Sequence, residues 1–222
     1  MTEKTVYAIH TGPVLVDVIR LLAKELMPGV RVVNVVDDGL LAEVREAGEL
    51  TTAVSRRLVG YGVIAAASGA DAILNCCSSV GEAAELLQKV IEIPVVRIDD
   101  AMARQAVKLG PRIAVVATLA TTLEPTKRLI ARRANEGRHD VKLTSYVAGE
   151  AFDSLLAGDG AKHDALVNEV IDRAMRENDV VVLAQGSMAR LVAAREPAHV
   201  PVLTSPREGV KSLYAHLQGN QA

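Results

Sequence analysis

The sequence predicts an α/β protein built on parallel sheets that helices cover on both faces. Three observations support this class. Short apolar runs of strand length alternate with segments of helical periodicity, and the runs are rich in Val and Ile without polar alternation. The same order of elements then begins again near Arg112. Strands that alternate with amphipathic helices form parallel sheets, since each return to the sheet needs a helical crossover.

The first half of the chain is interpreted as four strands separated by helices. Each expected strand is an apolar run that ends at a turn residue, and each expected helix repeats apolar residues every three or four positions. The strands are expected at residues 6–9, 30–36, 71–76 and 93–98. The helices are expected at residues 13–26, 40–47, 50–67, 80–91 and 99–109.

The second half repeats this arrangement. Strands are expected at residues 112–117, 141–147, 179–184 and 200–204. Helices are expected at residues 124–137, 161–176 and 187–195, with a last helix that begins at Ser205-Pro206. Residues 118–122 are expected to form a loop, and residues 149–160 to be the least regular segment because glycines mark turns there.

Composition excludes several classes of function. The formal net charge of the 222 residues is −2 and only 2% are aromatic, so neither nucleic acid nor an anionic membrane is an expected partner. No signal peptide and no apolar run long enough for a membrane span is recognisable. The two cysteines are sequence neighbours, which offers no disulfide framework. We therefore expect a reduced, soluble, cytoplasmic protein.

An internal repeat organises the chain. The stretch at residues 71–79 matches the stretch at residues 179–187, each opening with Asp. Six positions separate that Asp from a turn residue, which is Cys77 in the first half and Gln185 in the second. The repeat predicts two similar α/β lobes.

Polar residues gather where the expected strands end. Ligands of open α/β sheets bind beyond the carboxyl ends of the strands. If the two lobes face each other at those ends, one cleft would collect a shared set of small polar side chains. This set is His10, Thr11, Cys77, Ser78, Ser79, Thr118, Gln185, Gly186 and Ser187.

Cys77 is the strongest candidate for chemistry. It lies at an expected strand-to-helix turn, where Ser79 and Glu82 have the spacing of a capping box. Unpaired N–H groups at a helix start favour thiolate over thiol, so Cys77 is a candidate base or nucleophile near neutral pH. Strand alternation directs Cys76 to the other face, where it is interpreted as a core residue.

Those strand-end motifs resemble the aspartate/glutamate/hydantoin racemase superfamily, which includes maleate isomerases and arylmalonate decarboxylases. Cys77-Ser78-Ser79 is similar to the family's Cys-Asn-Thr, and Ala184 to Met188 is similar to its second-lobe Gly-Cys-Ala-Gly-Met. The resemblance implies two pseudo-symmetric lobes with the active site in the cleft between them. The first would comprise residues 1–98 and 205–222, with Cys77, and the second residues 99–204, with Gln185.

The resemblance also implies an activity. We expect a cofactor-independent racemase or isomerase that acts at the α-carbon of a small carboxylic acid through a Cys77 thiolate, with His10 as a candidate second proton carrier. The expected substrate-binding residues are Thr11, Ser78, Ser79, Thr118, Gln185, Gly186 and Ser187. No metal-ligand spacing and no Gly-x-Gly-x-x-Gly after the first strand is present, so neither metal nor cofactor is expected.

Alternatives remain open because the family's racemases typically use two cysteines, and Gln185 stands where the second would be. One thiol suits an arylmalonate-type decarboxylase or a single-base lyase. A non-catalytic protein that binds small carboxylates is a third hypothesis. The serines could also serve only as helix caps. Assembly into a homo-oligomer is compatible with the resemblance.

Overall fold

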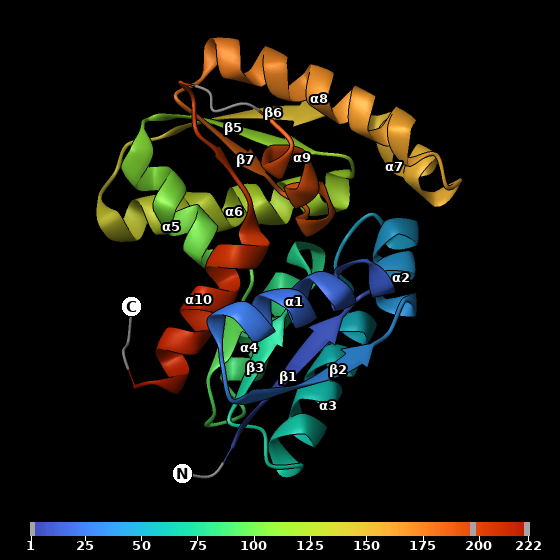
Figure 1. Cartoon of the computed structure of the whole chain (residues 1–222), viewed down its shortest axis with the longest axis vertical. Helices are drawn as coiled ribbons and strands as arrows, with labels where there is room; N and C mark the ends of the chain where they lie inside the picture. The colour runs from blue at the N-terminus through green and yellow to red at the C-terminus, as the bar shows by residue number, and fades with distance from the viewer. Residues whose placement is uncertain (1–2, 196–198, 220–222) are drawn as a thin grey trace. The chain divides into compact units, whose positions relative to one another are not determined.

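The computed structural model describes residues 3–195 and 199–219, and its chain divides into two compact units. The first comprises the residues up to Asp99 and those from Pro206 onward, and the second comprises Asp100–Ser205. Each unit contains a four-stranded parallel sheet with helices (Figure 1). The predicted α/β class with two parallel sheets is confirmed.

The first unit has the strand order β2-β1-β3-β4, with all neighbours parallel. Its strands are β1 (Lys4–His10), β2 (Val30–Val36), β3 (Ala72–Asn75) and β4 (Val95–Arg97). Its helices are α1 (Val16–Leu26), α2 (Gly39–Ala47), α3 (Thr52–Ala67), α4 (Gly81–Gln88) and α10 (Ser205–Leu217). Two short 3-10 turns, η1 (Pro13–Leu15) and η2 (Ser78–Val80), follow the ends of β1 and β3.

Strand alternation divides the side chains of the first sheet between two apolar layers. Ala8 and Leu74 pack with residues of α1 and α10 on one face. Ile9 and Ile73 pack with residues of α2, α3 and α4 on the other (Figure 1). Because both faces are covered, the polar groups at the carboxyl ends of the strands are the natural place for chemistry.

The second unit repeats this order as β6-β5-β7-β8, again parallel throughout. Its strands are β5 (Arg112–Ala117), β6 (Lys142–Val147), β7 (Val180–Leu183) and β8 (Val202–Leu203). Its helices are α5 (Asp100–Leu109), α6 (Ala120–Gly137), α7 (Gly149–Leu156), α8 (Gly160–Glu177) and α9 (Ala189–Ala193), with the 3-10 turn η3 (Gly186–Met188) after β7. Residues of α5 and α6 cover one face of the sheet, and residues of α7, α8 and α9 cover the other.

Two elements of this unit differ from prediction. α6 begins at Ala120, inside the expected loop, so Pro125 lies within the helix and not in its first turn. The segment expected to be irregular contains α7, in which Ala151 is fully buried. Gly149 starts that helix and Gly158 follows it with φ of 82°, so these glycines bound a helix.

An equivalent aspartate ties two strands together at the start of each sheet. Asp71 accepts the backbone N–H of Thr5 at 2.8 Å and the ammonium of Lys4 at 2.7 Å. Asp179 accepts the backbone N–H of Arg112 at 2.9 Å and also pairs with its guanidinium. These partners hold the pKa of both carboxyls below their usual range. The repeated aspartate therefore has a structural role. Asp71 lies before the amino end of β3, whereas Cys77 lies beyond its carboxyl end.

Within the described chain, none of the helices combines the length and the apolar character that crossing a bilayer requires.

Candidate active site

Cys77 lies between the end of β3 and the turn η2. Its backbone is extended, with φ of −140° and ψ of 123°, and its carbonyl accepts a hydrogen bond of 2.9 Å from Nδ2 of Asn75. The side chain is half-buried and contacts the apolar layer that contains Ile9 and Val80. Cys76 is buried in the layer on the other face, as alternation predicts.

Several donors converge on the sulfur of Cys77. The hydroxyls of Thr11 and Ser79 and the nearby backbone N–H groups of Ser79 and Val80 each lower the pKa of the thiol. The Val80 N–H donates to the Cys77 carbonyl at 3.4 Å. Burial of the thiol is the larger effect and raises the pKa above its ordinary value. The predicted donors therefore favour the thiolate, while burial opposes it, and the thiolate that we expected near neutral pH remains a prediction.

The hydroxyl of Ser78 has a different partner. It hydrogen-bonds to the carboxylate of Asp99, which is fully buried. Arg97 binds the same carboxylate through Nε at 3.0 Å and Nη2 at 2.9 Å. The Ser78 hydroxyl therefore has a partner inside the first unit, and the substrate contact that we expected of it remains a prediction.

Ser79 does not begin the helix α4. The cap position is Val80, which makes no side-chain cap bond. A 3-10 turn intervenes between the strand and the helix. This turn brings the hydroxyl and N–H of Ser79 to Cys77 instead.

His10 lies deep at the end of β1 and is 1% exposed. Its Nε2 lies 2.9 Å from Oδ1 of Asn34, while its Nδ1 is buried without a hydrogen-bond partner among the described residues. Burial lowers its pKa, more than the bond to Asn34 raises it, which keeps the imidazole neutral at neutral pH. Strand alternation directs His10 and Cys77 to opposite faces of the sheet, and the role of His10 as a second proton carrier remains a prediction.

In the second unit, the turn that follows β7 contains the side-chain amide of Gln185. Oε1 of Gln185 accepts the backbone N–H of Thr118 at 2.7 Å, and Nε2 of Gln185 donates to Oγ1 of Thr118 at 2.7 Å. Gly186 and Ser187 follow at the half-buried start of η3, and Arg190 donates to the Ser187 carbonyl at 2.8 Å. Gln185 therefore holds Thr118, and the substrate contact we expected of it remains a prediction.

The structure thus brings together Thr11, Cys77 and Ser79 in the first unit, and Thr118 with Gln185 in the second. Sequence reasoning missed Asn75 and Arg97 as partners of the cysteine turn. Asn75 falls in the strand expected at residues 71–76 and Arg97 in the strand expected at residues 93–98. Only their polarity within an apolar run could have drawn attention to either residue. Among the described residues, no group of three or more His, Cys, Asp or Glu side chains could hold a metal ion.

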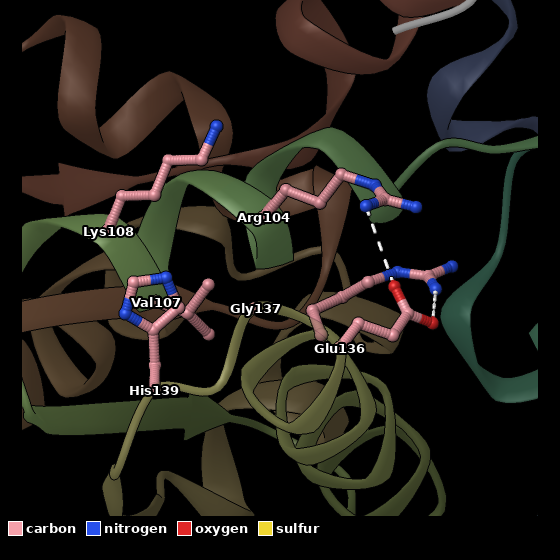
Figure 2. Close-up of a pocket in the computed structure, with 7 residues that line it drawn as sticks. Arg104, Val107, Lys108, Glu136, Gly137 and His139 are labelled. Atoms are coloured by element: carbon pink, nitrogen blue, oxygen red, sulfur yellow. Dashed lines mark hydrogen bonds and ion pairs between the residues drawn. The ribbon is translucent and has the colours of Figure 1, made fainter.

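A basic pocket of about 180 Å³ lies elsewhere in the second unit, between the carboxyl-terminal parts of α5 and α6 (Figure 2). It is lined by Arg104, Val107, Lys108, Arg133, Glu136, Gly137 and His139. Acids already neutralise its two arginines, since Arg104 and Arg133 each pair with Asp100 and Glu136. No strand-end residue lines this pocket, so it is separate from the candidate active site.

Two parallel sheets with polar turns at their carboxyl ends define a class of α/β protein built by duplication. A model of the Asp/Glu/Hydantoin racemase family matches residues 13–213, and the chain therefore belongs to this family. Racemases are isomerases, so membership supports the isomerase class. A search of curated proteins found no match.

Solved racemases share the fold. The structure is similar to a glutamate racemase of Bacillus anthracis, with a TM-score of 0.76 and 17% identity over 99% of this chain and 83% of that one. An allantoin racemase of Klebsiella pneumoniae gives 0.70 and 18% over 99% and 89%. The aspartate racemase of Picrophilus torridus gives 0.74 and 16% over 97% and 94%. At these identities the similarity establishes the fold alone.

Proposed function

We propose that this protein is a cofactor-independent racemase or isomerase that acts at the α-carbon of a small carboxylic acid, with Cys77 as the proton-transferring group. The observation that carries the proposal is that Thr11 and Ser79 act on the Cys77 thiol at a strand end and lower its pKa. Hydrogen-bond donors around a sulfur stabilise its anionic form, which is the form that removes a proton. A purely structural cysteine needs no such donors.

The proposed step is a proton transfer. The Cys77 thiolate takes the α-hydrogen as a proton, the S–H bond forms, and the electron pair of the C–H bond passes into the carboxylate as an enediolate. Hydroxyl and N–H donors at the strand-end turns would stabilise that charge. Thr11 and Ser79, with Thr118, Gly186 and Ser187 of the second unit, are the residues that we propose for this role.

The raised pKa of Cys77 has two opposing consequences. A smaller fraction of the enzyme holds the thiolate at neutral pH, but each thiolate is a stronger base toward a weakly acidic C–H bond. We therefore expect turnover to increase as the pH rises above neutrality.

A panel of chiral amino and hydroxy acids, analysed by chiral chromatography, tests this proposal. Wild-type protein should interconvert the enantiomers of at least one acid, and Cys77→Ala and Cys77→Ser should not. Cys76→Ala is the matched control, because Cys76 is buried on the other face and should leave turnover intact. Full turnover by Cys77→Ala would refute the assignment.

Single-base chemistry is the second candidate, and the Thr118–Gln185 pair favours it. An amide cannot exchange protons at neutral pH, and this one is held by two hydrogen bonds. Decarboxylation of a substituted malonate needs proton delivery from one side only. Release of CO₂ from such malonates, with a single product enantiomer and no racemisation of the panel above, would identify the protein as a decarboxylase.

A further inference from the structure

We propose that Asp99 is a positioning residue for Cys77 and acts through the hydroxyl of Ser78, the residue that follows the cysteine. The inference rests on the proposed function of Cys77 and identifies what holds the thiol-bearing turn in place. Asp99 itself does not touch the sulfur.

The carboxylate of Asp99 belongs to a buried cluster of ion pairs. Both of its oxygens are engaged by Arg97, and Nη1 of Arg97 donates to Oε1 of Glu85 on α4 at 2.5 Å. Asp99 is fully buried and the Arg97 side chain is 4% exposed. The guanidinium keeps the pKa of Asp99 below its usual range despite that burial, so the carboxylate stays charged.

This cluster fixes the turn that follows Cys77 at two points. The Ser78 hydroxyl hydrogen-bonds to Asp99, and Gly81 lies directly over the Arg97 guanidinium. A Cβ at Gly81 would lie 2.4 Å from Cζ of Arg97, which is closer than any real contact. The backbone between these two points carries Ser79, whose hydroxyl and N–H act on the sulfur, and Val80, whose N–H donates to the Cys77 carbonyl at 3.4 Å.

A buried ion pair is costly for folding, and apolar side chains of similar volume often serve stability as well or better. The Asp99–Arg97 pair lies against the one turn that carries a half-buried thiol. A charged acceptor binds a hydroxyl more tightly than a neutral one, so it restricts the turn to a single orientation. In that orientation Ser79 acts on the sulfur through its hydroxyl and N–H, and the Val80 N–H holds the Cys77 carbonyl, which is what positioning requires.

Ser78→Ala tests the inference, with the rate of Cys77 alkylation by iodoacetamide as a function of pH as the readout. Without the bond to Asp99 the turn is no longer fixed, and the hydroxyl and N–H of Ser79 lose their alignment with the sulfur. We expect the alkylation profile to shift about one pH unit to higher pH, which is about tenfold slower alkylation at pH 8. In an active protein, kcat should fall by a similar factor while KM changes little.

Ser55→Ala is the matched control, because it also removes a serine hydroxyl that is hydrogen-bonded within the first unit, at 2.9 Å to the Thr51 carbonyl. It should leave the alkylation profile unchanged. Gly81→Ala, which displaces the Arg97 guanidinium and keeps Ser78, should shift the profile in the same direction as Ser78→Ala.

A wild-type profile for folded Ser78→Ala, or equal shifts for Ser78→Ala and Ser55→Ala, would overturn the proposal. Alkylation needs no turnover, so this result is independent of whether Cys77 proves to be catalytic.

Discussion

Thr118 and Gln185 exchange two hydrogen bonds of 2.7 Å across the carboxyl ends of β5 and β7. The first unit places Thr11 and Cys77 at the equivalent strand ends, where the Thr11 hydroxyl bonds to the sulfur. The duplication has therefore kept a threonine bonded to the residue after the third strand, while that residue differs in chemistry. A thiol occupies one copy and an amide the other.

The first prediction concerns the stability that Gln185 provides. Gln185→Ala removes both bonds and leaves the buried N–H of Thr118 without its acceptor, so we expect the free energy of unfolding to fall by about 2 kcal/mol. Gln185→Glu is the matched control, because its carboxylate can accept from both the N–H and the hydroxyl of Thr118. Urea denaturation measures both variants, and equal stability of Gln185→Ala and wild type would contradict the role assigned to the amide.

The second prediction concerns the ionisation of Cys77. Because burial raises its pKa above the ordinary value of 9.0, alkylation of the wild-type protein should still accelerate as the pH rises past 9. Mass spectrometry should locate the modification on Cys77, while the buried Cys76 stays unmodified. An alkylation rate that reaches its plateau below pH 8 would show that the hydrogen-bond donors, and not burial, determine the direction of the pKa shift of Cys77.

The third prediction concerns the acid side of the stability profile. The pKa of His10 is lowered in the folded protein, so the unfolded chain binds this proton first as the pH falls below 6.5. The stability due to the neutral imidazole is thus present above pH 6.5 and is lost as the pH falls through the lower folded value. Folded His10→Gln should lose less stability between pH 7 and pH 5 than wild type does, as measured by urea denaturation. Parallel losses in the two proteins would show that the other histidines and the carboxylates account for the acid sensitivity.

The fourth prediction uses two glycines of α3. A Cβ at Gly62 would lie 2.1 Å from Cδ2 of Leu87 on α4, whereas a Cβ at Gly60 meets nothing within 4 Å. Gly62→Ala should therefore destabilise the protein by about 1–3 kcal/mol through overpacking. Gly60→Ala should stabilise it by about 0.5–1 kcal/mol, because alanine loses less backbone entropy within a helix. Thermal denaturation distinguishes the two, and shifts of the same sign would contradict the close α3–α4 packing.

Most of the fold could be predicted because its signals are local. The apolar runs at Val30–Val36 and Arg112–Ala117 coincide with β2 and β5 over their whole length. Where prediction failed, tertiary packing decided the outcome. Burial of Ala151 against the second sheet stabilises α7 in a segment that glycines bound. Helix α6 accommodates Pro125 in its interior.

The candidate site was only partly predictable. Strand alternation and the repeat identified Cys77 as a strand-end residue, but neither indicates which hydroxyl turns toward the sulfur. Ser78 bonds to Asp99, which lies 21 positions further along the chain, and no local pattern specifies that contact. The burial of His10 likewise depends on how the sheet is covered. Hydrogen-bond partners between distant segments are set by the folded backbone, and these were the features that sequence reasoning missed.

The most direct test of the central proposal is the exchange of the α-hydrogen of small carboxylic acids in D₂O, followed by proton NMR. Wild-type protein and Cys76→Ala should introduce deuterium at the α-carbon of a responsive acid, and Cys77→Ala should introduce none above the uncatalysed rate. Undiminished exchange by folded Cys77→Ala would contradict the account, because it would show that another group removes the proton.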